Sequence, residues 1–489
     1  MSGGADIFSI LRESAARWRD RTAIVHNARA FTFAELHSAA EAASRQLDSA
    51  GIRTGDKVGL LCAEGPEYIA AFFAICHLGA VVVPISPAYK PGEIKNLASE
   101  IGLDAFCCSA KLAERAPGAG ATVAVPLFGD RSSLSLRRLE PTAADERARL
   151  LGVHAASIRF SSGTTGKAKG IVLSHETIFE RASAKCEAIP LSDSDSVLYL
   201  FSTGRSVPTR LLVSIRGGAK IVLADALRAP EIESSVREHA VTQIFAPPFV
   251  YQALLHEPEM DARSWQRVEY FFSTASALPP QAAENFRARF GREIVQYYSS
   301  GEVGSPFVNF RGDISKRGSV GTVVGGYQVK LAPPDSEPEG DGAFGEICVR
   351  GPGMFDAYYK PWRPRAEVLA DGWFHTGDLA RRDADGYYWI VGRVKDAINV
   401  GGVKVFPAEL EALLLGHPAV EDAVVFDAPE ARFGEVPHAR VKLRAGAAGD
   451  ARELMRYVNE RVSVFKALRA IQFVDELPKT VTGKVKRGA

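Results

Sequence analysis

Cysteine is scarce in this sequence, and neither charge sign is in excess. The 489 residues include six cysteines, and none of them forms a Cys-x-x-Cys pair or lies beside a histidine at metal-ligand spacing. We therefore expect reduced, mostly buried thiols, with no disulfide framework and no structural zinc. The 59 basic and 58 acidic residues leave a formal net charge of +1, so no overall field favours nucleic acid or an anionic membrane. A nucleotide must be held by local groups.

A secretory signal is also lacking, because no basic segment followed by an apolar one opens the chain. The longest apolar stretch, residues 68–85, is long enough to span a membrane. Gly79 and Pro84 interrupt it, which favours a buried helix followed by a buried strand. The sequence therefore predicts a cytoplasmic protein without a membrane span.

The length exceeds that of one ordinary core and predicts two or more domains. Through the first three-quarters of the chain, short apolar segments alternate with amphipathic ones, which favours parallel sheets covered by helices. Ligands bind such sheets beyond the carboxyl ends of the strands. The clearest predicted strands are 57–62, 80–85, 157–162, 219–224, 242–247 and 268–273.

Near residue 340 the pattern changes to short, β-rich segments punctuated by glycine. After Gly402, helix-like and strand-like segments follow in the order helix, strand, strand, helix, strand. They predict a compact α+β unit of about a hundred residues, a plausible domain size. Residues 392–398, which lie between the two regions, are a candidate hinge.

A glycine-rich loop, SSGTTGKAKG at residues 161–170, has the composition of a phosphate-binding loop. Only two residues separate Gly163 from Gly166-Lys167, whereas the common nucleotide loop needs four. Glycines let backbone N–H groups converge on an anion, and the hydroxyl and ammonium groups add donors. A mobile surface turn has the same composition. Alone, the loop supports phosphate binding only moderately.

Three further segments carry polar residues with two interpretations each. Glu302, among small residues, is either a Mg²⁺ ligand beside a phosphate site or a solvated turn glutamate. Asp378, with Arg393 to assist it, either accepts hydrogen bonds from a ribose diol or caps a turn. Lys484 lies near the end of the sequence, where lysines are usually solvated.

Taken together and in this order, the four segments resemble the motifs of the adenylate-forming superfamily, which includes acyl-CoA synthetases, peptide-synthetase adenylation domains and luciferases. FTFAEL, GDKVGLLC and LGAVVVPIS also resemble that family, so the likeness covers nearly the whole chain. It implies ATP-dependent activation of a carboxylic acid to an acyl-adenylate, with release of pyrophosphate. The acyl group then passes to a thiol, either coenzyme A or a carrier-protein phosphopantetheine.

The resemblance implies an α/β fold with two domains. A large, multi-subdomain N-terminal domain with helix-covered sheets, residues 1–392, would bind ATP and the acid. A hinge at 393–395, which contains Lys395, would lead to a small, mobile α+β C-terminal domain at 396–489. This domain would rotate between the half-reactions and bring Gly401 and Gly402 to the thiol tunnel.

The resemblance also assigns the nucleotide site. Glu302 matches the Mg²⁺ carboxylate, and Asp378 and Arg393 match the ribose-binding pair. Lys484 matches the lysine that bridges the acid and the α-phosphate, and Thr165, Glu302 and Lys484 are the expected catalytic residues. The remaining candidates for nucleotide binding are Ser161, Ser162, Gly163, Thr164, Gly166, Lys169, Ser276, Tyr298, Ser299 and Ser300.

Two segments depart from the family pattern. Gly301 stands where relatives often have threonine, so a hydroxyl that commonly contacts phosphate is missing. Residues 274–278 read TASAL in place of a Gly-Gly-Ala-Pro-Leu-like segment, so that loop is expected to differ in shape.

For the acid, the resemblance places Ser202 where amino-acid-activating relatives usually carry an aspartate. An α-amino acid is disfavoured, because Ser202 cannot pair with a buried ammonium. Arg205 and Arg210 are either structural, or one of them pairs with a second carboxylate or a polar substituent on the acid. The other pocket-lining candidates, which fit an aryl or medium acyl group, are Phe245, Ala246, Pro247, Phe249 and Tyr298.

A ligase that uses coenzyme A is the leading hypothesis. The alternatives are a stand-alone ligase that loads an acyl carrier protein in trans in natural-product biosynthesis, a non-catalytic relative that binds nucleotide or acyl-adenylate, and a luciferase-like oxygenase. Retention of Lys484, Asp378, Glu302 and the whole loop argues against the non-catalytic relative.

Overall fold

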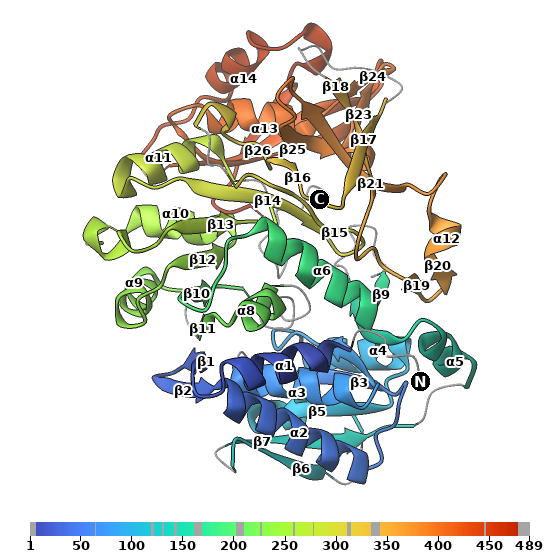
Figure 1. Cartoon of the computed structure of the whole chain (residues 1–489). Helices are drawn as coiled ribbons and strands as arrows, with labels where there is room; N and C mark the ends of the chain where they lie inside the picture. The colour runs from blue at the N-terminus through green and yellow to red at the C-terminus, as the bar shows by residue number, and fades with distance from the viewer. Residues whose placement is uncertain are drawn as a thin grey trace.

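Two large sheets with helices between and outside them form the first three-quarters of the chain (Figure 1). The computed structural model describes residues 6–63, 65–118, 122–129, 132–140, 144–160, 169–201, 210–224, 227–257, 260–276, 278–310, 314–333, 343–444 and 446–477.

The first large sheet has a parallel centre and antiparallel edges. In spatial order its strands are β16 (Thr322–Val323), β15 (Gly304–Val308), β14 (Ile294–Ser300), β13 (Tyr270–Ser273), β12 (Gln243–Ala246), β10 (Ser196–Tyr199), β11 (Lys220–Leu223), β1 (Thr22–His26) and β2 (Arg29–Thr32). The strands from β14 to β1 run parallel, whereas β2, β15 and β16 pair antiparallel.

The second large sheet is also mixed. Its strands are β20 (Arg363–Pro364), β19 (Ala357–Tyr359), β9 (Gly170–Ser174), β8 (Ala155–Phe160), β4 (Val81–Pro84), β3 (Lys57–Leu61), β5 (Ala105–Ser109), β7 (Ser132–Arg138) and β6 (Thr122–Leu127). Among the described strands of this sheet, the parallel pairs join β8 to β4, β4 to β3 and β3 to β5. The expected parallel sheets are therefore confirmed at the centres and wrong at the edges, where hairpins close them.

One helical layer lies between the two sheets and shares a continuous core with both. It contains α1 (Ile7–Arg17), α2 (Phe33–Ser49), α3 (Pro66–His77), α6 (His175–Ala188) and α8 (Leu212–Gly217). The FTFAEL segment begins α2 with a capping box, in which the side chains of Thr32 and Glu35 each accept a hydrogen bond from the other residue's backbone N–H.

The outer faces of the sheets are covered as well. On the first sheet lie α9 (Ala229–Glu238), α10 (Pro248–His256), η3 (Ala262–Trp265) and α11 (Pro280–Phe290). On the second sheet lie α4 (Pro91–Ile101), η1 (Ala110–Arg115) and α5 (Ala144–Gly152). Strands covered on both faces read as continuous apolar runs, which is why the sequence revealed them.

The remaining chain forms two smaller units. A four-stranded antiparallel sheet contains β17 (Gln328–Ala332), β18 (Ala343–Arg350), β21 (Phe374–Arg382) and β22 (Tyr388–Arg393). The C-terminal α+β unit contains β23 (Ile398–Val400), β24 (Val403–Val405), α13 (Pro407–Leu415), β25 (Val420–Glu430), β26 (Gly434–Leu443), α14 (Ala451–Asn459) and β27 (Ala470–Phe473). The short helices are η4 (Ile314–Lys316), α12 (Arg365–Val368), η5 (Val394–Asp396) and η6 (Val464–Lys466).

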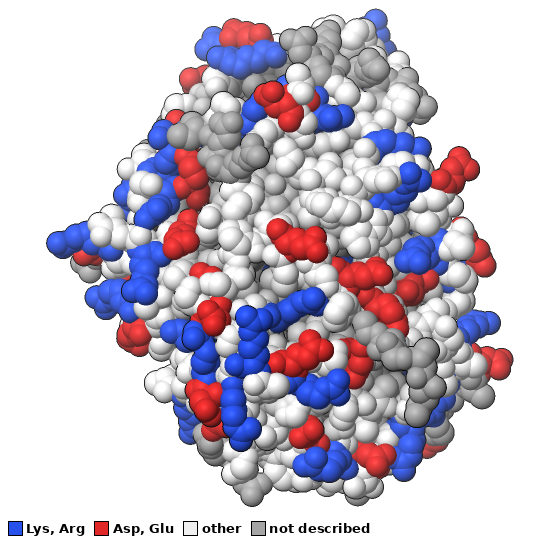
Figure 2. All heavy atoms as spheres, in the orientation of Figure 1, with Lys and Arg blue, Asp and Glu red and all other residues white. Residues whose placement is uncertain are grey.

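The apolar stretch at 68–85 forms most of the buried helix α3 and the buried strand β4, as expected. None of the helices in the described part of the chain is long and apolar enough to cross a membrane. All six cysteines are free thiols, and five of them are buried. Basic and acidic side chains are interspersed on the face shown in Figure 2.

Candidate functional site

The glycine-rich loop joins two antiparallel neighbours, β8 and β9. Ser161, Ser162, Gly163, Thr164, Thr165 and Gly166 lie outside the described residues. Lys169 is described, and its ammonium lies 5.2 Å from the ring centroid of Tyr358 on β19. The base of the hairpin thus faces a tyrosine that the sequence analysis did not single out.

Tyr358 links this hairpin to Glu302. Its hydroxyl donates a 3.1 Å hydrogen bond to Oε1 of Glu302, which follows β14. Burial and the Glu302 carboxylate raise the pKa of Tyr358, so the phenol stays a donor. Lys169, Tyr358 and Glu302 therefore form one cluster, although 189 positions separate Lys169 from Tyr358 in the sequence.

A buried arginine on α6 holds the backbone of the Glu302 segment. Arg181 is 4% exposed, and its Nη2 donates 2.9 Å hydrogen bonds to the carbonyl oxygens of Gly301 and Glu302. Its Nε donates to the carbonyl of Gly353 at 2.5 Å. The amide of Phe355 adds a 2.7 Å bond to the Glu302 carbonyl. Backbone dipoles thus surround the charge and fix this turn.

Both carboxylate oxygens of Asp378 on β21 accept hydrogen bonds from side chains. Its side chain is 9% exposed; Oδ1 accepts from Nε of Arg393 at 2.8 Å and Oδ2 from the Tyr298 hydroxyl at 2.5 Å. Register explains the first contact, because Asp378 and Arg393 are directly opposed on β21 and β22. Burial and Asp378 raise the pKa of Tyr298, which therefore remains protonated.

A second carboxylate braces the turn before Asp378. Glu346 on β18 accepts from the Gly377 amide at 2.8 Å and lies 2.9 Å from Nδ1 of His375. Cys348 Sγ is 3.5 Å from the same nitrogen, so three potential metal ligands converge. Sequence spacing could not reveal this cluster, because Cys348 and His375 meet only through strand pairing.

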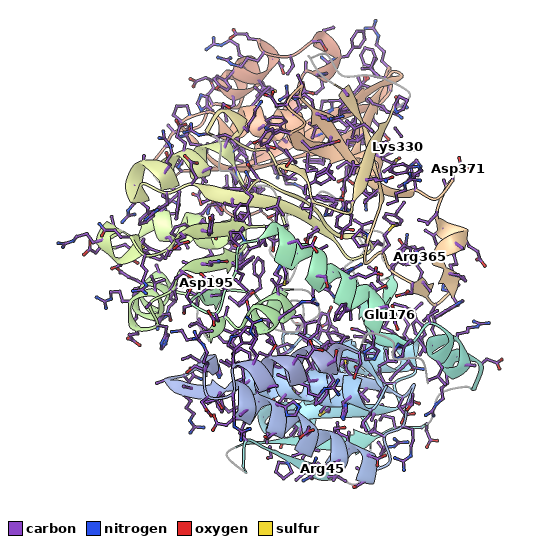
Figure 3. All side chains as sticks on the ribbon, viewed as in Figure 1. Arg45, Glu176, Asp195, Lys330, Arg365 and Asp371 are labelled. Carbon is purple, nitrogen blue, oxygen red and sulfur yellow. The ribbon has the colours of Figure 1, made fainter. Side chains whose placement is uncertain are left out.

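At the edge of this sheet, where Figure 3 labels Lys330 and Asp371, the Lys330 ammonium lies 4.8 Å from the Trp373 ring centroid.

The loop after β13 supplies Ser276, whose side chain is exposed. Its neighbour Ala275 has φ +81°, in the region that favours glycine. On β14, Ser299 Oγ lies 3.5 Å from Thr274 Oγ1, and Ser300 Oγ accepts from the Val303 amide at 3.2 Å. The two loops therefore lie side by side at the carboxyl ends of β13 and β14.

The structure separates the residues proposed for the acid. Phe245 is 3% exposed and stacks between Tyr199 and Phe272, at centroid distances of 5.2 and 4.4 Å. Pro247 is buried, whereas Phe249 on α10 is 43% exposed. Ser202 and Arg205 lie outside the described residues.

Two other residues from this region come together. Arg210 is described, and its guanidinium lies 4.3 Å from the ring centroid of Phe201 and 5.7 Å from that of Tyr297. Tyr297 is a further residue that the sequence analysis did not single out.

In the C-terminal region, Gly401 and Gly402 form the turn between β23 and β24. Their φ values of +57° and +93° suit glycine in a tight hairpin. The Gly401 amide donates to the Phe433 carbonyl at 2.9 Å, and both glycines are exposed. Lys395 lies in η5, directly after Arg393 and Val394. Lys484 lies outside the described residues.

Comparisons with known proteins address the family directly. Residues 11–359 match the family model described as AMP-binding enzyme, and residues 409–484 match the AMP-binding enzyme C-terminal domain. The chain belongs to the AMP-binding enzyme family. The family expected from the motifs is confirmed, and so is the fold class.

The family relatives match along almost their whole length. A feruloyl-CoA synthase from an Amycolatopsis species is 31% identical over 475 residues, which cover 96% of this chain and 94% of the relative. ATP-bound MatB from Rhodopseudomonas palustris superposes with a TM-score of 0.85 at 25% identity, covering 99% and 97% of the two chains. The anthranilate CoA ligase AuaEII, in complex with anthranoyl-AMP, gives 0.82 at 25% identity, with 100% and 96% covered.

Two buried cations on α6 were missed because charged residues usually mark a solvated face. Arg181 and Lys185 nevertheless lie three and seven residues after Ile178, which is fully buried. This spacing places them on the same face of the helix as Ile178. The helical spacing from Ile178 could therefore have predicted that Arg181 and Lys185 are buried.

Proposed function

We propose that this protein is an AMP-forming acid–CoA ligase. It converts a carboxylic acid and ATP to an acyl-adenylate and pyrophosphate, then transfers the acyl group to the thiol of coenzyme A. The observation that carries the proposal is the match to both family regions, together with a 31% identical relative named feruloyl-CoA synthase and a 30% identical relative named 4-coumarate–CoA ligase-like 9. The alternatives of a carrier-protein ligase and of an oxygenase lack a comparable observation.

Asp378 binds the ribose of ATP. Each of its oxygens already accepts one hydrogen bond, and each retains a lone pair for a ribose hydroxyl. Arg393 and Tyr298 hold the carboxylate in a fixed orientation before the nucleotide arrives. Ser276, Ser299 and Ser300 complete the nucleotide site.

The phosphates bind near the base of the β8–β9 hairpin. Lys169, with the loop residues from Ser161 to Gly166, supplies donors and positive charge for pyrophosphate as it leaves. The Glu302 carboxylate is the kind of hard oxygen ligand that Mg²⁺ prefers, so Glu302 would hold a bound Mg²⁺. When bound, Mg²⁺ neutralises phosphate charge; Arg181 and Tyr358 position the glutamate.

The C-terminal domain supplies the remaining groups. Lys484 neutralises charge between the acid and the α-phosphate. Rotation about the hinge, Arg393 to Lys395, then brings Gly401 and Gly402 toward the thiol. ATP-bound MatB superposes with a TM-score of 0.85 and apo MatB with 0.76, which supports a nucleotide-bound-like domain arrangement in this structure.

The acid carries an aryl or medium acyl group in preference to an α-amino group. Aromatic side chains of Phe201, Phe245 and Tyr297 lie at or near the carboxyl ends of β10, β12 and β14. The names of two relatives, a feruloyl-CoA synthase and an anthranilate CoA ligase, support an aromatic acid.

The test is ATP–pyrophosphate exchange over a panel of aryl, medium-chain, dicarboxylic and amino acids, followed by addition of coenzyme A. We expect exchange with one class of acid, and release of AMP that depends on coenzyme A. Exchange without turnover of coenzyme A would contradict the proposed acceptor and favour a carrier protein. Exchange with none of the acids would contradict the proposed function.

Asp378→Asn provides the matched check on the ribose site. We expect exchange activity to fall about 100-fold, because a charged acceptor is lost and Arg393 is left unpaired. Asp383→Asn is the control, since Asp383 follows the same strand but pairs with Lys316 at 2.6 Å. Equal losses in both variants would contradict a specific role for Asp378.

A further inference from the structure

A lysine on α6 is buried between the two large sheets and has no hydrogen-bond or ion-pair partner in the described part of the chain. Lys185 is 5% exposed, and its ammonium lies 4.5 Å from the ring centroid of Tyr297 on β14. Among the described residues, no hydrogen-bond acceptor or carboxylate pairs with this ammonium. Burial of a charged or amino group without a partner is costly, so such a group usually has a function.

A second cation lies beside the first. Arg210, which is half-buried, faces the same Tyr297 ring at 5.7 Å. Burial, and then repulsion by Arg210, lower the pKa of Lys185 well below its ordinary value. No carboxylate of the described chain forms an ion pair with either residue, and residues 202–209, which precede Arg210, include neither aspartate nor glutamate.

The Tyr297 hydroxyl completes the set. It is buried, and no described residue meets it within full hydrogen-bond distance and angle, although Arg210 lies close enough to oppose the rise in the pKa of Tyr297 that burial causes. The Lys185 ammonium and the Arg210 guanidinium thus both lie against the Tyr297 ring, and all three side chains carry hydrogen-bond donors. A negatively charged hydrogen-bond acceptor would pair with these three side chains.

The three donors lie where the acid is proposed to bind. Tyr297 and Tyr298 are successive on β14, so their side chains leave opposite faces of the strand. Tyr298 contacts Asp378 of the proposed ribose site, whereas Tyr297 faces α6 and Arg210. The donors thus lie across the strand from the nucleotide, near the carboxyl end of the sheet, where ligands of such sheets bind.

We infer that the substrate is a dicarboxylic acid, whose second carboxylate binds Lys185, Arg210 and Tyr297 while the first is activated. This inference rests on the proposed function and specifies its substrate class. A dianionic acid supplies the missing acceptor oxygens and neutralises the two cations. A monocarboxylic acid of the same shape would leave both cations without an ion-pair partner, and Lys185 would be buried as well.

The experiment compares each dicarboxylic acid with its own monoamide in ATP–pyrophosphate exchange. The two acids have the same length and differ in one charge, and the panel contains short aliphatic and benzene dicarboxylic acids. We expect kcat/KM for the best diacid to exceed that for its monoamide at least about tenfold. Lys185→Met and Arg210→Gln should each lower this preference toward one, because turnover of the diacid falls more than turnover of the monoamide.

Arg216→Gln is the matched control. Arg216 lies in α8, and its guanidinium stacks 4.7 Å from the Phe179 ring centroid, but it is exposed. We expect the diacid preference to be unchanged in this variant. Circular dichroism of all three variants checks that the fold is retained.

A pH profile separates substrate binding from a structural role. The charged and titratable groups that act on Lys185 are Arg210, Tyr297 and the thiol of Cys186. A bound dianion favours protonated Lys185, so binding takes up a proton above the pKa of the free enzyme. We expect KM for the diacid to rise with pH in that range, and Lys185→Met to abolish the rise.

Equal use of diacid and monoamide would overturn the inference and leave the proposed function intact. Survival of the full diacid preference in both variants would also overturn it. Exchange with none of the acids would instead contradict the proposed function, and the inference would fall with it.

Discussion

Two buried cations one turn apart on α6 have opposite surroundings. Arg181 is 4% exposed and Lys185 5%, so burial does not distinguish them. Arg181 donates to three backbone carbonyls, whereas Lys185 has no hydrogen-bond or ion-pair partner among the described residues. One charge is compensated by the chain itself, and the other is left for a ligand.

The partners of Arg181 explain why the chain retains a charge there. Gly301, Glu302 and Gly353 lie more than 100 positions away in the sequence, so the arginine ties two distant segments to α6. Carbonyl dipoles that the fold already orients stabilise a buried cation without any further rearrangement of the backbone. Lys185 has no such carbonyl acceptors among the described residues. It therefore lowers the stability of the ligand-free protein, and its charge is compensated only when an anion binds.

The largest effect should come from Arg181→Met. Removal of the guanidinium takes the Arg181 donor from the carbonyls of Gly301 and Gly353 and leaves the Glu302 carbonyl with only the Phe355 amide, so we expect the free energy of unfolding to fall by about 3–5 kcal/mol. Exchange activity should fall as well, because the backbone of Glu302 is no longer held. Urea unfolding and ATP–pyrophosphate exchange below the unfolding range measure the two effects.

Arg181→Lys is the matched variant, since it keeps the charge but cannot reach all three carbonyls. We expect an intermediate loss of stability. If Arg181→Met were as stable as the wild-type protein, the contrast between the two cations would be wrong.

Much of this arrangement could be predicted from sequence. The apolar runs at 57–62 and 242–247 correspond within one residue at each end to β3 and β12, because strands buried on both faces need such runs. The contact between Asp378 and Arg393 was expected from the family resemblance. Their direct opposition on β21 and β22 shows how the fold produces it.

Other features depend on which strands pair, and residue type does not encode that. Tyr358 reaches Glu302 only because β19 pairs with β9, far earlier in the chain. Cys348 meets His375 through a similar pairing. Arg181 and Lys185 were overlooked for a different reason, since a buried charge contradicts the usual hydrophobic pattern. The roles of the candidate residues and the domain boundaries remain predictions.

Lys185→Met should have the opposite effect on stability. The variant removes a buried amino group that has no hydrogen-bond or ion-pair partner among the described residues, and it keeps a side chain of similar length. We therefore expect the free energy of unfolding to increase by about 1–3 kcal/mol near neutral pH. The gain should accompany the loss of diacid preference, which is the usual exchange of function for stability. Chemical denaturation measures it.

The gain from Lys185→Met should depend on pH in a defined direction. Burial lowers the pKa of Lys185 below its ordinary value of 10.5, so between the two values the unfolded chain binds one proton more. Wild-type stability therefore rises with pH there, by up to about 1.4 kcal/mol per unit, and the variant lacks this term. The advantage should be smaller at about pH 9.5 than at about pH 7. A constant difference would mean that Lys185 does not titrate with a lowered pKa.

Gly301 tests how rigidly Arg181 holds its segment. A Cβ at this position would lie 2.4 Å from Cδ1 of Ile171, which fills the space that a side chain would need. We expect Gly301→Thr to cost about 1–2 kcal/mol through overpacking. Ile171→Ala should relieve the clash, so the double mutant should be more stable than the sum of the single effects. Strict additivity in urea unfolding would contradict this account.

The smallest effect should come from Ala275→Gly. Ala275 has φ +81°, which costs an L-residue about 1 kcal/mol, and glycine adopts it without strain but loses more entropy on folding. We therefore expect a change in stability of less than about 1 kcal/mol, with the diacid preference unchanged. Backbone strain in this loop and the charge of Lys185 both lower the stability of the protein locally. Only the charge of Lys185 would be neutralised by the second carboxylate of the acid. If Ala275→Gly altered the diacid preference as strongly as Lys185→Met, the conformation of this loop would determine the preference. A specific role for the Lys185 charge in selecting the diacid would then be contradicted.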